Sequence, residues 1–162
     1  MRVIKEAAIV EDSWQLSVDI EADASIPAGD VIIPFSLWQL RQQEITEREG
    51  KIGILIDGDI EVEDVVPFLE HFALIAINFV AFKDGRGYSQ ARLLRDQYAY
   101  EGDIRAVGDV LRDQLYYMQR CGFTSYDLRK DKNPEEALKG FKDFSVKYQT
   151  AADGAVPVYR QR

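Results

Sequence analysis

Residues 31–56 read VIIPFSLWQLRQQEITEREGKIGILI, two short apolar runs separated by a polar segment. The runs at 31–35 and 52–56 are apolar at nearly every position, which predicts strands that are covered on both faces. Residues 36–50 predict a helix that Ser36 caps and Gly50 closes. A strand, a helix and a second strand in this order form a parallel crossover, so the stretch predicts an α/β fold.

The same alternation continues along the chain. Further strands are predicted at 74–82, 103–108, 124–128 and 144–150, and further helices at 62–72, 88–98, 109–122 and 133–144. Pro67 should kink or split the first of these helices, whereas Asn133 and Pro134 should begin the last one. The first thirty residues alternate in polarity instead, which predicts an antiparallel pair or an edge strand.

We therefore expect a single α/β domain over residues 1–162. It should comprise an N-terminal strand extension (1–30), βα repeats (31–150) and a tail (151–162). The sheet should be mainly parallel, with about five or six strands flanked by helices. A doubly wound, Rossmann-like sheet is the preferred arrangement, because strands without polar alternation suggest cover on both faces. The alternative is a half-barrel that pairs with a second copy of the chain. In that case the protein would be a homo-oligomer.

Composition argues against several classes of protein. The net charge is −8, and nucleic-acid binding requires a basic face. No apolar run approaches the length of a membrane span, and the first residues lack the pattern of a signal peptide. Cys121 is the only cysteine and His71 the only histidine, so we expect neither a disulfide nor a metal site. These features predict a cytoplasmic protein that binds neither nucleic acid nor membrane.

Positive charge is concentrated in one part of this acidic chain. Residues 83–130 contain nine basic and seven acidic side chains, and seven of the twelve arginines lie between Arg86 and Arg129. This distribution favours a small anion or an acidic partner over a nucleic-acid duplex. The alternative is that the arginines pair with neighbouring aspartates on solvated helix faces.

Parallel α/β sheets bind ligands in the loops that follow the carboxyl ends of their strands. That rule places several residues from distant loops on one edge of the predicted sheet. They are Asp57, Asp84, Arg86, Tyr88, Ser89, Asp109 and Arg129.

The loop at 84–89, DGRGYS, is the first candidate for an anion site. Gly85 and Gly87 permit positive φ and let a ligand approach the backbone. A helix that begins near Tyr88 or Ser89 offers free N–H groups, and Arg86 could hold an oxyanion through two N–H groups. In the alternative interpretation the glycines form a turn, Ser89 caps the helix and Arg86 pairs with Asp84.

Further candidates extend this edge. Arg95 could add to a cationic rim, and Arg112 should be exposed on its helix. Arg105 lies inside an apolar strand, where a charge must be paired, with Asp109 or Asp127, or be functional. Asp109 is a natural N-cap for the helix that follows Gly108. The full set of candidate ligand-binding residues is Asp57, Asp84, Gly85, Arg86, Gly87, Tyr88, Ser89, Arg95, Arg105, Gly108, Asp109 and Arg112.

No familiar cofactor motif is present. Counting G-x-G-x-x-G from Gly85 places Gln90 where the third glycine should stand, and the chain has no Walker lysine. The cofactor, if there is one, stays unknown.

Residues 82–123 read FKDGRGYSQARLLRDQYAYEGDIRAVGDVLRDQLYYMQRCGF. This run resembles the signature of a bacterial family of uncharacterised proteins, and the resemblance covers most of the chain from Ile32 to Leu128. Members are usually encoded beside the genes of assimilatory sulfite reductase and adenylylsulfate reductase. They are labelled oxidoreductases of sulfite reduction from this gene neighbourhood. The resemblance implies a cytoplasmic role in reducing sulfate or sulfite to sulfide, and it supplies no catalytic residues.

Three functions stay open at this point. The first is an accessory protein of sulfite assimilation that binds a small oxyanion or an adenylylated sulfur compound at 84–89. The second is a docking protein for components of sulfite reductase or adenylylsulfate reductase. Its docking surface would consist of Arg92, Arg95, Arg112 and Tyr116. The third is an enzyme in which Asp57, Asp84 or Asp109 performs acid–base chemistry beside the arginines.

Overall fold

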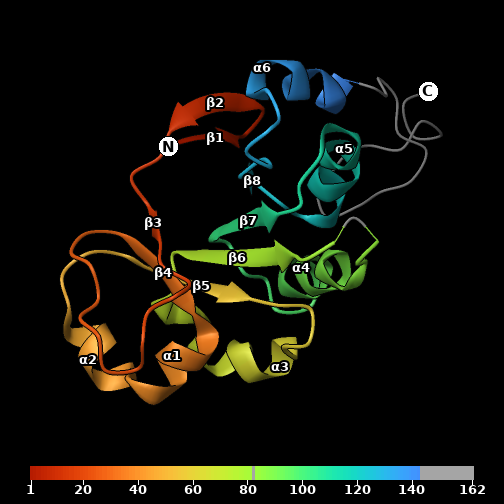
Figure 1. Ribbon diagram of the computed structural model, residues 1–162. Helices are drawn as coiled ribbons and strands as arrows, with labels where there is room; N and C mark the ends of the chain where they lie inside the picture. Colours follow the sequence, from red (N-terminus) through yellow and green to blue (C-terminus); the bar gives the residue numbers. More distant parts are fainter. Residues whose placement is uncertain (82, 143–162) are drawn as a thin grey trace.

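The computed structural model describes residues 1–81 and 83–142 (Figure 1). The strands are β1 (Arg2–Lys5), β2 (Ala8–Glu11), β3 (Gln15–Leu16), β4 (Val31–Pro34), β5 (Ile52–Ile56), β6 (Leu74–Phe79), β7 (Asp103–Gly108) and β8 (Ser125–Tyr126). The α-helices are α1 (Phe35–Leu40), α2 (Gln42–Glu47), α3 (Val62–Val65), α4 (Arg86–Asp96), α5 (Arg112–Cys121) and α6 (Pro134–Ala137). Two 3-10 helices, η1 (Val66–His71) and η2 (Leu138–Lys142), follow α3 and α6.

The eight strands form one mixed sheet in the order β2-β1-β8-β7-β6-β5-β4-β3. Neighbours from β3 to β8 are parallel, whereas β1 is antiparallel to both β8 and β2. The expectation of a mainly parallel sheet of five or six strands was therefore wrong, because the first sixteen residues add three strands. From β3 to β8 the spatial order follows the chain order, without the reversal of a doubly wound sheet. The sheet is a curled half-barrel, which confirms that part of the alternative, and pairing with a second copy stays a prediction.

A short segment shows why the sheet must curl. Residues 12–14, which we call the strap, connect β2 to β3, the outermost strands on opposite edges. In a flat sheet of this size the outer strands would lie about 34 Å apart. The four peptide steps from Glu11 to Gln15 span at most about 14 Å. Figure 1 shows this part of the chain passing across the open side of the curled sheet.

The helices of residues 1–81 and 83–142 lie on the convex face of the sheet. In β6, Ile75, Ile77 and Phe79 belong to a core cluster to which every described α-helix contributes buried side chains. Leu74 and Ala76 alternate with them and lie in a second, smaller cluster on the concave face. That second cluster also contains Ile32, Val107, Leu55 and, from the strap, Trp14. In the described part of the chain, the strap and not a second layer of helices covers part of the concave side, so the strands are apolar on both faces.

The helix that was predicted at 36–50 is divided into α1 and α2 at Arg41. The Arg41 backbone leaves helical geometry, with φ −131° and ψ 33°. Its guanidinium donates to the carbonyl of Ala24 at 2.6 Å and pairs with Glu44, which ties this corner to the β3–β4 connection. Pro34, and not Ser36, stands at the N-cap position of α1.

Two other helix ends follow their local sequence. Pro67 separates α3 from η1, as predicted, because a proline interrupts the helical hydrogen bonds. Asn133 caps α6, and its side chain accepts a hydrogen bond from the backbone N–H of Glu135 at 2.8 Å. The strand that was predicted at 144–150 lies outside the described residues.

The glycines of the 84–89 loop do not adopt positive φ. Gly85 is the N-cap of α4 with φ −87°, and Gly87 is a buried residue within the helix. A Cβ at Gly87 would lie 2.8 Å from the ring of Phe79 and 2.9 Å from the side chain of Ile77. Gly87 therefore lets α4 pack closely on β6, and its function is to fit helix against sheet.

We expect Gly87→Ala to lower the free energy of unfolding by about 1–3 kcal/mol, because the added methyl overpacks this contact. Gly85→Ala is the matched control, since a Cβ there would meet no atom within 4 Å. Urea denaturation of both variants measures the difference. Equal stabilities of the two variants would show that α4 does not pack on β6 as described.

Candidate functional site

A cavity of about 1220 Å³ opens on the concave side of the sheet. It lies where the parallel strands end at their carboxyl termini, and residues from the N-terminal strands close its sides. Leu16, Leu55 and Val107 give it an apolar surface. Its polar lining comes mainly from Ser36, Asp57, Asn78, Asp127, Arg129, Lys130 and Lys132.

Hydrogen bonds link the carboxyl ends of neighbouring strands at the edge of this cavity. Asp57 directly follows β5, and its carboxylate accepts a hydrogen bond from the Asn78 side chain of β6 at 2.8 Å.

Gly108 ends β7 with φ +91°, and its neighbour Asp109 donates its backbone N–H to the Phe79 carbonyl at 2.8 Å. The positive φ favours glycine, so Gly108 fixes the direction in which the chain leaves the strand.

The cationic side chains of the cavity come mostly from the loop after β8. Arg129 lies between two carboxylates, 2.6 Å from Asp131 and 3.1 Å from Asp109. Hydrogen bonds from Arg129 lower the pKa of Asp131 to about 2, and the same contacts raise the pKa of Arg129. The charge of Arg129 is therefore already balanced by protein groups.

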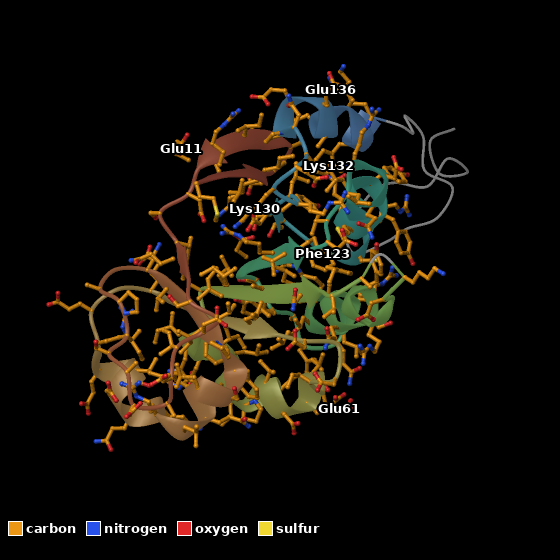
Figure 2. All side chains as sticks on the ribbon, viewed as in Figure 1. Glu11, Glu61, Phe123, Lys130, Lys132 and Glu136 are labelled. Carbon is orange, nitrogen blue, oxygen red and sulfur yellow. The ribbon has the colours of Figure 1, made fainter. Side chains whose placement is uncertain are left out.

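Lys130 and Lys132 supply the remaining positive charge of this loop. Lys132 lies 3.7 Å from Asp131, which is a loose and exposed pair. Lys130 is exposed and forms no ion pair with any residue in 1–81 or 83–142. Figure 2 shows both side chains on the segment that joins β8 to α6. Arg2, which also lines the cavity, is paired with Glu135, so Lys130 is the lining cation that is most available to a ligand.

Asp127 differs from the other carboxylates of the cavity because its side chain is half-buried. Its burial raises the pKa of the carboxyl group, although nearby Arg105 acts in the opposite direction. No hydrogen bond to this carboxyl group is found in the described part of the chain. A carboxyl group of this kind at a cavity wall is suited to proton transfer or to a hydrogen bond with a ligand.

Arg105 lies on the concave face, but it is a structural residue of the sheet. Its side chain is 2% exposed and donates two hydrogen bonds, of 2.6 and 3.1 Å, to the carboxylate of Asp12 in the strap. Its Nε donates to the Ser125 hydroxyl at 3.0 Å. The expected partners Asp109 and Asp127 were wrong, since the hydrogen-bonded carboxylate is 93 residues away in sequence and the second carboxylate within 4 Å is Asp103, at 3.7 Å.

The 84–89 loop lies on the predicted edge of the sheet, outside the lining of the cavity. Arg86 makes two hydrogen bonds of 3.0 Å to the carboxylate of Asp84, and this contact lowers the pKa of Asp84. Tyr88 packs between Phe79 and Tyr117, with ring centroids 5.2 and 5.1 Å away. Ser89 is exposed on α4, which begins before it at Arg86 and leaves it no capping function. The local ion pair, which was the alternative interpretation, is the one present.

Arg95 lies at the opposite edge of the sheet. Its guanidinium donates to the carbonyls of Tyr100, Gly102 and Gly122 at 2.6, 2.8 and 2.9 Å. Tyr100 and Gly102 precede the amino end of β7, so Arg95 cannot extend a rim at the carboxyl ends. Burial lowers the pKa of Arg95, and its hydrogen bonds hold loops together. This correction also removes Arg95 from the proposed docking surface.

Asp109 and Arg112 have other positions than expected. Leu111, and not Asp109, is the N-cap of α5, and its N–H donates to the Gln114 side chain at 2.9 Å. Asp109 pairs instead with Arg129 beside the cavity. Arg112 is exposed at the start of α5, where its backbone lies against Gly140 of η2.

Ligands of parallel sheets bind at the carboxyl ends of the strands, and this rule correctly brought together Asp57, Gly108 and the loop after β8. All three line the cavity. Sequence reasoning missed Asn78, Asp127, Lys130 and Lys132 as site residues. A signal for Lys130 and Lys132 exists, because they belong to the loop that follows the strand predicted at 124–128. Asp127 lies within that predicted strand, whereas β8 ends at Tyr126 and leaves Asp127 at the cavity.

Residues 1–81 and 83–142 contain no group of three or more His, Cys, Asp or Glu side chains that could hold a metal ion. Within the same residues, no helix has the length and apolar character needed to cross a membrane.

Residues 53–159 match the sequence profile of a family described as bacterial proteins of unknown function (DUF934). The matched region extends from the second residue of β5 through β8 and the loop of Lys130, so it contains most of the cavity wall. A comparison with curated proteins finds no match.

Proposed function

The chain belongs to this bacterial family of proteins of unknown function, and we propose that it binds a small anionic molecule in the concave cavity. The ligand is a small oxyanion or an adenylylated sulfur compound. The protein then serves as a cytoplasmic accessory protein of assimilatory sulfate or sulfite reduction. The assignment to this pathway rests on the resemblance of residues 82–123 to the bacterial family described above. The proposed association of the protein with components of sulfite reductase or adenylylsulfate reductase rests on the same resemblance.

One observation carries the proposal. Lys130, a cation without an ion pair among the described residues, stands at the wall of a large cavity at the carboxyl ends of parallel strands. Ligands of parallel α/β proteins bind at this end of the sheet. A lysine there attracts negative charge and donates up to three hydrogen bonds to it.

The size and lining of the cavity favour the adenylylated compound over a bare oxyanion. The volume of about 1220 Å³ exceeds the range of roughly 300–1,000 Å³ that is typical of small-molecule sites, and sulfite would fill only a small part of it. Leu16, Leu55 and Val107 offer an apolar surface for a base. Asp57 and Asn78 offer hydrogen-bonding groups for a sugar, and Lys130 offers charge for the anionic end.

We expect Lys130→Glu to weaken binding of adenylylsulfate by about tenfold or more, because a charge-assisted contact is replaced by repulsion. Isothermal titration calorimetry with adenylylsulfate, sulfate and sulfite measures this. Lys51→Glu is the matched control, since it makes the same charge change before the amino end of β5.

The control separates local contact from overall charge. Equal losses of affinity in both variants would show a nonspecific effect of net charge. The proposal would be wrong if none of the three anions bound to the wild-type protein.

A further inference from the structure

Asp127 is positioned to contact a ligand in the cavity. It directly follows β8, and its backbone N–H donates to the Ala106 carbonyl of β7 at 2.8 Å, which fixes the residue at the sheet edge. Its side chain lines the cavity, and within residues 1–81 and 83–142 its carboxyl group makes no hydrogen bond. The other aspartates of the lining, Asp57 and Asp131, are already bound by Asn78 and Arg129.

Charged groups from four segments face this carboxyl group. They are Arg105 of β7, Asp12 of the strap, Lys130 of the same loop and the amino group at residue 1. Arg105 is bound to Asp12, so these two charges largely cancel at Asp127. The balance is decided by burial, which raises the pKa of the Asp127 carboxyl above the ordinary value for aspartate.

Building on the proposed function, we propose that Asp127 takes up a proton from solvent when the anion binds, and that its O–H then donates a hydrogen bond to an anionic oxygen of the ligand. An ionised Asp127 would repel an anion held beside Lys130, whereas the protonated acid is a donor. Negative charge placed next to the carboxyl group favours its protonated form. Anion affinity should therefore fall as pH rises through the pKa of Asp127.

Calorimetric titration in two buffers of different ionisation enthalpy measures the proton uptake. Adenylylsulfate and sulfate are the probes, since neither changes its charge between about pH 5 and about pH 8. We expect fractional proton uptake by the wild-type protein, and an affinity several-fold higher at the lower pH. Asp127→Asn should abolish both effects. Asp59→Asn, an exposed carboxylate outside the lining, should retain them.

The outcomes separate this inference from the function on which it rests. Binding by the wild-type protein without proton uptake overturns the inference, whether or not Asp127→Asn folds, and leaves anion binding standing. Uptake that persists in Asp127→Asn overturns it equally. Failure of both probes to bind would overturn the inference and the proposed function together.

Discussion

Replacing Arg105 with alanine will lower the free energy of unfolding by about 3–5 kcal/mol. Arg105 is 2% exposed, and the side chain of its partner Asp12 is 6% exposed. Removal of the guanidinium leaves the Asp12 carboxylate buried without its counter-ion, and it also removes the hydrogen bond to Ser125. The strap would then lose its polar anchor on the concave face. Chemical denaturation followed by circular dichroism measures the change.

Two further variants test the cause of this loss. Arg92→Ala removes an exposed pair with Asp96 on α4, and it should cost less than about 0.5 kcal/mol. The double variant Arg105→Met with Asp12→Leu removes both charges of this pair, and Asp103, which lies 3.7 Å from Arg105, keeps Lys5 at 3.5 Å. The double variant should therefore recover much of the lost stability. If Arg105→Ala is as stable as the wild-type protein, the strap is not held by this ion pair.

Replacing Gly108 with alanine should cost about 2–4 kcal/mol of stability. Its φ of +91° is unfavourable for a residue with a side chain. A Cβ there would also lie 2.5 Å from the Phe79 carbonyl oxygen and 2.6 Å from the Asn78 side-chain oxygen. The backbone of β6 cannot move aside without disturbing the sheet, so relieving this contact would cost much of the stability of the fold.

The matched control is Gly58→Ala, in a neighbouring loop on the same edge. The three atoms nearest to a Cβ at Gly58 would all belong to the end of the Arg86 side chain, which is flexible and 60% exposed. We expect Gly58→Ala to change stability little, as measured by thermal unfolding of the three proteins in parallel. A Gly108→Ala variant as stable as Gly58→Ala would contradict the geometry at the end of β7.

The local sequence predicted the alternation of strands and helices well. Apolar runs marked β4 to β7, Pro67 marked the split between α3 and η1, and Asn133 marked the start of α6. The choice between a doubly wound sheet and a half-barrel was wrong. A strand that is apolar on both faces has the same pattern whether helices or a strap cover its second face. Trp14 and Asp12 make that difference, and neither stands out by periodicity.

The sequence predicted where the candidate site lies in the fold, but it predicted only some of the residues that line the site. The rule that ligands bind at the carboxyl ends of parallel strands requires only the order of strands and helices along the chain. It therefore located Asp57, Gly108 and the loop after β8. Which cations are free depends on pairing in space. Arg86 is bound by an aspartate two residues away, whereas Arg105 is bound by one that is 93 residues away. No one-dimensional pattern reports the second pair, or shows that Lys130 lacks a comparable partner among the described residues.

The most direct test of the account is a crystal structure of the chain with adenylylsulfate. We predict electron density for the ligand in the concave cavity, with its anionic end within about 3 Å of the Lys130 ammonium group. The base should lie on the apolar surface near Leu55 and Val107. Density for the ligand at the 84–89 loop or on an outer helix face, with the cavity empty, would contradict the central claim.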